Sequence, residues 1–557
     1  MRKKSMKKLA IATCMAMLVS GCGAQTTPEA TEAAKESSEV KETTKAAEET
    51  KKESETEASK KSSDKVELIT FNCKPNYEYI YMDPSKEDDS KLIAIGHYPS
   101  IDLGFYEDGE FKEYQGLYEK LSESISAYNK DRKESFDSLV DECRELAKDD
   151  TRFDDKSEDA YTYYYSVDTD ATVTRSDDVV FSIADTTYTF MGGPHPNTVF
   201  NCYNIDSETG KVLTISDVVT DKAALIDALD KKLHEDSPDL DNELLDPDLK
   251  GTLGNMYDEI DGMSLTFNLT NDSMVVSFSA YDLASYAVGP KESVLRFEDY
   301  PELFEARYTK TAENYAVALT PDTPYTFKTA DGSVRNLTFS YNASQGEYMD
   351  DCYDVTITLD GKEFTDPVQY SYGLSPYLMY QDHKAFLYVR SRSDNDYEFT
   401  NIYDLNGEKA SKVEDSMDVS FYSTTPVNPE DFIMYSRSAL LSTYTIFRHY
   451  ELDTADGRPV PMTNEWWIQT DIKLTLKKDL TLSVMDELTA EGIDNGKDEK
   501  FPKGTVFKPV RTNSLSWVDL ETEDGRYARV YVDNSDWPQT IGGVDIEELF
   551  DGIIFAG

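Results

Sequence analysis

The segment from Gly23 to Lys65 limits where this chain can build a fold. It consists almost entirely of Ala, Glu, Lys, Ser and Thr, it contains no aromatic residue, and Val40 is its only large apolar side chain. Such a segment cannot bury enough apolar surface to offset the entropy lost on folding. We therefore predict a disordered tether over residues 23–65, and a packed core must come from residues 66–557.

The N-terminus has the form of an export signal. Its first eight residues are strongly basic, and the apolar run Leu9–Val19 that follows is too short to cross a bilayer. The run ends in Leu-Val-Ser-Gly-Cys at Leu18–Cys22, which resembles the lipobox of bacterial lipoproteins. The resemblance implies cleavage before Cys22 and diacylation of its thiol, and two acyl chains anchor a protein stably where one does not. The alternative is an ordinary secretory peptide.

These two segments together predict a location. Residues 1–22 would be a lipoprotein signal peptide with its lipobox, and the diacylglyceryl group on Cys22 would make the membrane a partner. The tether would then lift the folded part away from the bilayer. We expect a lipid-anchored protein on the extracellular face of a Gram-positive-type bacterium.

The charge of the chain limits the classes of partner that it can bind. The formal net charge is −51, and the first 65 residues hold slightly more basic than acidic side chains, so the acidic excess falls on residues 66–557. An acidic surface repels phosphate backbones and attracts cations. The sequence therefore predicts no nucleic-acid binding and favours a cationic partner.

The cysteines after the tether leave two alternatives open. Cys73, Cys143, Cys202 and Cys352 are widely spaced and form no CxxC pair. They could make two disulfides in any of three pairings, or they could be buried free thiols.

Hydrophobic periodicity predicts an α+β module over residues 66–311, an antiparallel sheet with two or more helices. Apolar residues recur at spacings of three and four from Leu117 to Leu146, which indicates a long amphipathic helix. A second helix would begin at Thr220 or Asp221. The expected strands are Tyr161–Val167, Val179–Phe190 and Thr198–Ile205, followed by a hairpin of Ser264–Leu269 and Met274–Ser279.

All-β domains are expected after this module. Short alternating segments such as Tyr353–Leu359, Ala385–Val389 and Tyr444–Tyr450 predict a sandwich or a few propeller-like blades over residues 312–470. Residues 471–557 resemble bacterial SH3-like barrels, with Lys-Gly-Thr before a Trp-containing strand and then an Asp-Gly turn. Such barrels often bind wall peptides, which makes Trp517, Tyr527 and Trp537 candidate wall-binding residues; the alternative is that the tryptophans belong to the core.

The stretch Tyr188–Lys211, "YTFMGGPHPNTVFNCYNIDSETGK", places His195 in a glycine- and proline-rich loop. A catalytic histidine would need partners, but the chain has no His-Glu-x-x-His, no Gly-x-Ser-x-Gly and no Walker loop. Its five histidines are too scattered for a His-rich zinc site. We predict no catalytic residue, no metal site and no cofactor.

The same stretch resembles a known extracellular module. Gly-Gly-Pro-His-Pro-Asn at Gly192–Asn197, Asn204–Lys211 and Thr214–Asp217 follow the order found in RsiV-type lysozyme-sensing anti-sigma factors and in the accessory domain of PdaC-type peptidoglycan deacetylases. Phe278–Pro290 is similar to the Tyr-x-aliphatic-Ala-x-Tyr-Ala-x-Gly segment of that module. No sigma-binding segment, transmembrane helix or deacetylase domain accompanies it, so the resemblance covers the ectodomain alone.

The resemblance makes the loop a candidate binding site. Gly192 and Gly193 permit unusual backbone angles, and the two prolines stiffen the loop. His195 and Asn197, with Tyr281 and Tyr286 from the second segment, would then contact a ligand. The alternative is that His195 and Asn197 hydrogen-bond the Gly289–Pro290 segment and hold the domain closed.

The function predicted from the sequence is that of a non-catalytic, lipid-anchored surface protein. It would engage a cell-wall component such as peptidoglycan, or a cationic protein; lysozyme is the candidate that the resemblance implies. The alternative is a wall-polymer hydrolase or deacylase of unrecognised type that uses His195.

Replacement of Cys22 by alanine tests the anchor. Without its thiol the chain cannot be diacylated, so we expect the Cys22→Ala protein to leave the membrane fraction for the soluble or secreted fraction. Cell fractionation followed by immunoblotting measures this, and Cys14→Ala, inside the signal, is the matched control. A Cys22→Ala protein that stays with the membranes would show that the anchor lies elsewhere.

Overall fold

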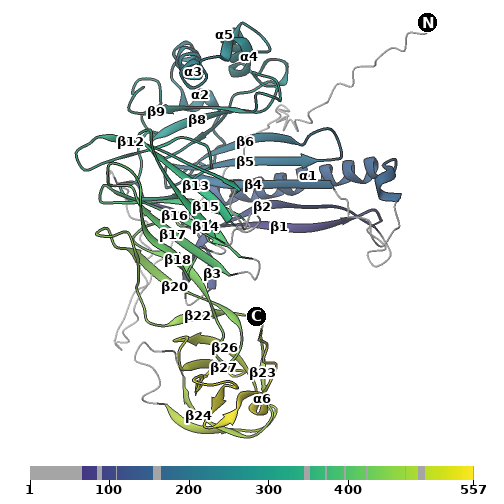
Figure 1. Ribbon diagram of the computed structural model, residues 1–557, viewed down its shortest axis with the longest axis vertical. Helices are drawn as coiled ribbons and strands as arrows, with labels where there is room; N and C mark the ends of the chain where they lie inside the picture. The colour runs from purple at the N-terminus through teal and green to yellow at the C-terminus, as the bar shows by residue number, and fades with distance from the viewer. Residues whose placement is uncertain are drawn as a thin grey trace, which may run out of the picture. The chain divides into compact units, whose positions relative to one another are not determined.

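The structure, a computed structural model, describes residues 65–83, 91–107, 110–154, 165–343, 352–369, 373–393, 397–421, 424–470, 472–486, 488 and 496–555. The predicted signal peptide, the tether and Cys22 lie outside these residues. Helices are few and strands predominate: an α+β portion comes first and β-sheets follow (Figure 1). Among the described residues, none of the helices is both long and apolar enough to cross a membrane.

The first sheet has six strands in the order β1-β2-β4-β5-β6, with β3 paired to β2. The pairs are antiparallel except β2 and β4, which run parallel. The expected antiparallel sheet is therefore wrong in this pair, because a parallel pair needs a long crossover and α1 provides it. The strands are β1 (Phe71–Tyr81), β2 (Leu92–Glu107), β3 (Glu110–Glu113), β4 (Tyr165–Ser176), β5 (Val180–Phe190) and β6 (Asn197–Asp206).

Helix α1 (Glu119–Ala147) covers one face of this sheet (Figure 1), which confirms the helix predicted from the spacing of its apolar residues. Its buried side chains recur every three or four residues and so form one stripe along the helix. Gly96 of β2 allows close approach of both neighbours, because a Cβ atom at this position would lie 2.1 Å from the carbonyl oxygen of Val167 on β4 and 3.0 Å from Cε2 of Phe136 on α1. The buried residues of the helix are Leu121, Ile125, Tyr128, Arg132, Phe136, Val140, Cys143 and Ala147.

Helices α2 to α5 pack on a three-stranded sheet, β7-β8-β9, in one hydrophobic cluster. The carboxylate of Asp221 caps α3 by accepting hydrogen bonds from the backbone N–H groups of Ala223 and Ala224, as its sequence position predicts. The predicted hairpin is also confirmed. The elements are α2 (Ile215–Val218), α3 (Lys222–Asp236), α4 (Leu240–Glu243), α5 (Leu249–Tyr257), β7 (Thr266–Leu269), β8 (Ser273–Phe278) and β9 (Lys291–Arg296), with 3-10 turns at Thr151–Asp154 and Ile260–Gly262.

Two antiparallel sheets follow and share one core, as the layers of a sandwich do. Of the two architectures left open for this region, the shared core favours the sandwich over propeller blades. One sheet contains β10 (Tyr315–Ala318), β15 (Leu374–Gln381), β16 (Lys384–Arg392), β17 (Glu398–Asp404) and β18 (Ser411–Met417); the other contains β11 (Tyr325–Lys328), β12 (Val334–Ala343), β13 (Cys352–Leu359) and β14 (Lys362–Gln369).

The last large sheet has eleven strands and joins residues on both sides of position 470. Strand β22 pairs with β26, so the segment before this position and the segment after it are hydrogen-bonded to each other. The strands are β19 (Phe432–Ser438), β20 (Tyr444–Leu452), β21 (Pro459–Pro461), β22 (Trp466–Gln469), β23 (Leu474–Leu476), β24 (Leu480–Met485), β25 (Lys497–Phe501), β26 (Val506–Thr512), β27 (Trp517–Thr522), β28 (Tyr527–Tyr531) and β31 (Phe550–Asp551); β29 (Thr540–Ile541) pairs with β30 (Val544–Asp545), and α6 spans Ile546–Leu549.

The state of the cysteines decides whether the chain has two disulfides. Cys73, Cys143 and Cys202 are free thiols. Each pairing of four cysteines into two disulfides would use all three of them, so the two-disulfide alternative is wrong. Burial raises the pKa of the Cys73 thiol to about 12 and that of Cys143 to about 12, so both are protonated and unreactive at neutral pH.

A buried ion pair joins the first sheet to the segment that leads into the later sheets. Arg175, at the end of β4, donates from Nε to the carboxylate of Asp177 at 2.7 Å, and both side chains are fully buried. The same guanidinium donates to the carbonyl oxygen of Tyr308 at 2.6 Å and to that of Lys310. Asp177 in turn accepts the backbone N–H of Val180 at 2.9 Å, which fixes the turn from β4 into β5.

Removal of one partner should destabilise the protein strongly. Arg175→Met leaves the Asp177 carboxylate buried without its counter-charge, and a broken buried pair typically costs about 3–5 kcal/mol. We expect a loss of this order in the free energy of unfolding, measured by urea denaturation of residues 65–557. Arg144→Met, which breaks the exposed pair with Asp141, should cost much less. Equal losses in the two variants would contradict the role given to Arg175.

Candidate functional site

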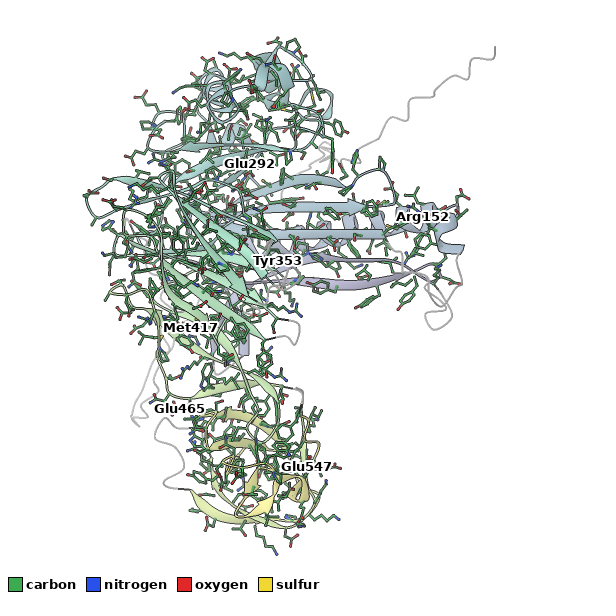
Figure 2. The ribbon with its side chains drawn as sticks, in the orientation of Figure 1. Arg152, Glu292, Tyr353, Met417, Glu465 and Glu547 are labelled. Atoms are coloured by element: carbon green, nitrogen blue, oxygen red, sulfur yellow. The ribbon has the colours of Figure 1, made fainter. Side chains whose placement is uncertain are left out.

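The predicted binding loop connects β5 to β6. Gly192 has φ +77°, in the region that favours glycine, so this position needs a residue without a side chain. The guanidinium of Arg152, labelled in Figure 2, donates to the carbonyl oxygen of Gly192 at 3.2 Å. Asn197 is exposed and is the first residue of β6, where it pairs with Thr189. The loop is therefore held at both of its ends.

His195 lies at the surface of this loop and packs on a residue far away in the sequence. Its ring stacks on that of Tyr286, with the centroids 3.8 Å apart and the planes at 21°. Its Nδ1 lies 2.8 Å from the carbonyl oxygen of Pro196. A carbonyl can only accept a hydrogen bond, so Nδ1 carries a proton and donates it to Pro196. The hydrogen bond of His195 thus goes to Pro196 and its stacking contact to Tyr286, not to Gly289 or Pro290 as the alternative proposed.

Tyr281 extends this surface. Its ring centroid is 6.3 Å from that of Tyr286, and 54% of Tyr281 is exposed. The segment is tied to β6 because Ser279 Oγ accepts the backbone N–H of Phe200 at 3.0 Å. Tyr281 itself has φ +75°, and its N–H donates to the carbonyl oxygen of Ala284 at 2.9 Å. We call His195, Tyr281 and Tyr286 the loop–tyrosine site.

The structure thus brings together two segments that the sequence separates by more than eighty residues. The loop–tyrosine site presents aromatic faces, the imidazole ring of His195 and a neighbouring exposed residue, Asn197. These groups can contact a partner by stacking and hydrogen bonding. Among the described residues, no group of three or more His, Cys, Asp or Glu side chains is placed to hold a metal ion.

The three aromatic residues predicted to bind wall peptides differ in exposure and in what they contact. Trp517 is half-buried beneath the guanidinium of Arg529, which lies 3.6 Å from its ring centroid. Tyr527 is half-buried on the neighbouring strand, opposite Glu521. Trp537 is 67% exposed and packs edge-to-face against Phe555, with the centroids 4.9 Å apart. Trp537 is therefore neither a core residue nor part of the patch around Trp517.

A second polar cluster was missed by sequence reasoning. His97 on β2 lies between two carboxylates of β4: its Nδ1 is 3.0 Å from Asp168 and its Nε2 is 2.9 Å from Asp170. Burial alone would lower the pKa of His97, but the hydrogen bonds to Asp168 and Asp170 outweigh it and raise this pKa from 6.5 to about 9. The alternation of Asp168 and Asp170 along one strand was the available signal, but it does not reveal which strand lies beside them.

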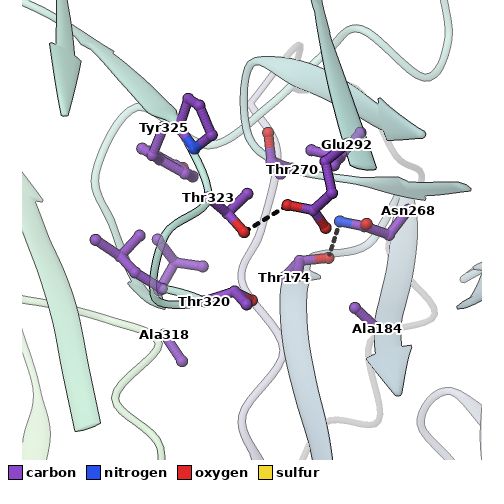
Figure 3. Close-up of a pocket in the computed structure, with 13 residues that line it drawn as sticks. Thr174, Ala184, Asn268, Thr270, Glu292, Ala318, Thr320, Thr323 and Tyr325 are labelled. Atoms are coloured by element: carbon purple, nitrogen blue, oxygen red, sulfur yellow. Dashed lines mark hydrogen bonds between the residues drawn. The ribbon is translucent and has the colours of Figure 1, made fainter. Parts of the chain in front are cut away.

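An internal cavity lies between the first sheet and the β10–β11 connection (Figure 3). The carboxylate of Glu292 accepts hydrogen bonds from Thr323 Oγ1 at 2.6 Å and Ser277 Oγ at 3.0 Å, and Asn268 Nδ2 donates to Thr174 Oγ1 at 3.2 Å. The cavity volume is about 40 Å³, which is room for a few water molecules but not for a metabolite. These polar groups join elements of the fold and do not make a ligand site.

Comparison with known proteins gives similarity to solved structures alone. No family model matches the chain, and no curated protein matches it. A DUF3298-family protein from Bacteroides fragilis NCTC 9343 is similar over 43% of this chain and 94% of its own, at 16% identity and a TM-score of 0.30. A DUF3298-family protein from Pseudomonas aeruginosa PAO1 is similar over 43% of this chain and 97% of its own, at 15% identity and a TM-score of 0.25. The structural neighbours thus include bacterial DUF3298 proteins.

The His97 cluster predicts a specific pH dependence. A pKa raised to about 9 means that the folded state binds this proton more tightly than the unfolded state, where the pKa is 6.5. The stabilisation is therefore complete below about pH 6.5 and is lost as the pH rises through 9. We expect His97 to titrate with a pKa near 9 in an NMR titration, and this pKa to fall in Asp168→Asn. Titration of His97 at or below 6.5 would contradict the cluster.

Proposed function

We propose that this chain is a non-catalytic, lipid-anchored binding protein of a bacterial cell surface. In this proposal the loop–tyrosine site engages a cell-wall component or a cationic protein, and lysozyme is the leading candidate. The observation that carries the proposal is the stack of His195 on Tyr286 beside the exposed ring of Tyr281. Hydrogen bonds from the loop and from β6 hold this aromatic surface in place.

Pre-organisation is what makes this surface suitable for binding. Ordering a loop on binding costs conformational entropy, and a loop already fixed by prolines and hydrogen bonds avoids most of this cost. Tyrosine rings add large contact areas with few torsions to immobilise. Aromatic anchors of this kind supply most of the affinity of protein interfaces.

Charge supports a cationic partner. The formal net charge of −51 would steer a basic protein towards this surface, but salt screens such steering beyond about 8–10 Å. Charge therefore speeds encounter more than it holds the complex, and affinity must come from the loop–tyrosine site. The resemblance of Gly192–Asn197 and Phe278–Pro290 to the RsiV and PdaC modules is what suggests lysozyme among basic proteins.

The C-terminal strands extend the proposal to the cell wall. We propose that residues 471–557 form an SH3-like barrel that docks wall peptides. The antiparallel strands β26, β27 and β28 support this, as does the Trp517 ring at the surface of β27. The exposed Trp537 would contribute a separate contact, because it packs on Phe555 instead of Trp517.

Titration of lysozyme into residues 65–557 tests the loop–tyrosine site. Isothermal calorimetry at low and at physiological salt should show saturable binding at both. Loss of one aromatic contact typically costs about 0.5–1.5 kcal/mol, so His195→Ala and Tyr286→Ala should each weaken binding about threefold to tenfold. Tyr397→Ala removes an exposed tyrosine (38%) that immediately precedes β17 and lies outside the loop–tyrosine site, and it is the control.

Three results would overturn the proposal or part of it. Absence of saturable binding at low salt would discard lysozyme as a partner. Binding that disappears at physiological salt and ignores both substitutions would reduce the interaction to nonspecific charge attraction. If the protein turned over peptidoglycan or acyl-sugars and His195→Ala abolished this turnover, the protein would be an enzyme and not a binding protein.

A further inference from the structure

The face of the first sheet opposite α1 carries exposed tyrosines. Strand β1 reads Tyr77-Glu78-Tyr79-Ile80, and successive side chains of a strand point to opposite faces. Ile80 is buried in the cluster that contains Phe136 of α1. Tyr77 and Tyr79 therefore point away from α1, and they are 68% and 65% exposed.

Strand register places these tyrosines in line with the His97 cluster. Tyr77 pairs with His97, His97 with Asp168, and Asp168 with Tyr188. One row of side chains therefore crosses β1, β2, β4 and β5. Neighbouring strands lie about 4.8 Å apart, so the row spans about 14 Å between Tyr77 and Tyr188. We call these four residues, with Tyr79 and Asp170, the tyrosine face.

The polar groups of this face are fixed and partly open. The ring of Tyr77 lies 5.1 Å from that of His97, whose side chain is only 12% exposed. The two carboxylates that hold His97 remain more accessible, with Asp168 31% and Asp170 79% exposed. A ligand would therefore meet two tyrosine platforms with carboxylate oxygens between them, already oriented by the imidazolium.

The charge of the tyrosine face differs from that of the whole chain. The imidazolium of His97 offsets one of the two carboxylates, so these three groups together carry a single negative charge, in a chain of net charge −51. A site that selected cations would leave its carboxylates unpaired. The carboxylate oxygens of Asp168 and Asp170 can still accept further hydrogen bonds. Hydrogen bonds from hydroxyl groups to carboxylates are strong.

We propose that the tyrosine face binds a neutral oligosaccharide. A sugar ring has a CH-rich face that packs on an aromatic ring, and hydroxyl groups around its edge that donate to carboxylates. Tyr77, Tyr79 and Tyr188 supply the rings, and Asp168 and Asp170 supply the acceptors. The row is long enough for several sugar units in an extended chain. This site goes beyond the proposed function: β1, β2 and β4, which carry most of it, contribute nothing to the loop–tyrosine site.

A matched set of hexasaccharides tests this proposal. The probes are the neutral β-1,4-linked hexamers of N-acetylglucosamine and of glucose, and the cationic hexamer of glucosamine. Calorimetry with residues 65–557 should give saturable binding of at least one neutral hexamer that is insensitive to salt. Tyr77→Ala and Tyr79→Ala should each weaken it about threefold to tenfold, whereas Tyr77→Phe should keep most of the affinity.

The controls separate this site from the loop–tyrosine site. Tyr286→Ala should leave hexasaccharide binding unchanged, and Tyr77→Ala should leave lysozyme binding unchanged, so either proposal can fail alone. Circular dichroism should show unaltered folding of the Tyr77 and Tyr79 variants, because both side chains are exposed. Failure of both neutral hexamers to bind would overturn the proposal, as would binding of a neutral hexamer that ignores both alanine substitutions. If the protein preferred the glucosamine hexamer and salt abolished this preference, the tyrosine face would be a site for cations and not for neutral sugars.

Discussion

The buried pair of Arg175 and Asp177 is the contact on which the arrangement of the functional surfaces depends. Two fully buried charges are tolerable only when each is paired and hydrogen-bonded. Here the guanidinium also binds the carbonyl oxygens of Tyr308 and Lys310, and the carboxylate binds backbone N–H groups at the start of β5. The turn between β4 and β5 is thereby fixed. Because β5 leads into the loop of His195 and also carries Tyr188, both surfaces follow from this turn.

The two surfaces combine the same kinds of group although they lie on different strands. Each combines exposed aromatic rings with a polar group whose orientation is fixed by a neighbour: His195 by Pro196 and Tyr286, and the carboxylates of β4 by His97. Rigid aromatic groups lose little entropy on binding, and fixed polar groups add direction. This combination suits recognition, which is the basis of both proposals.

The sequence predicted local features well and long-range ones poorly. The spacing of Leu121, Ile125 and Tyr128 located α1, and Asp221 located the start of α3, because a helix stripe and a cap depend on neighbouring residues alone. Strand β4 extends to Ser176, well beyond the expected end at Val167, because its polar alternation from Asp168 onwards does not resemble an apolar strand. The contact of His97 with Asp168 depends on a parallel pairing that no local pattern specifies.

Of the candidate site, the juxtaposition of the Gly192–Asn197 loop with the Tyr281–Tyr286 segment was expected, and His195 does stack on Tyr286. The spacing of residues in the sequence could not predict how the two segments touch. The ring of His195 stacks on Tyr286 and does not hydrogen-bond Gly289 or Pro290.

The central claim is that the loop–tyrosine site is formed before any partner binds. The most direct measurement is the proton NMR spectrum of the His195 ring in the free protein, assigned by comparison with His195→Gln. We expect upfield-shifted ring protons, owing to the ring current of Tyr286, and nuclear Overhauser effects between the two rings. Ring protons of His195 at the shifts of an unstructured histidine, without contacts to Tyr286, would contradict it.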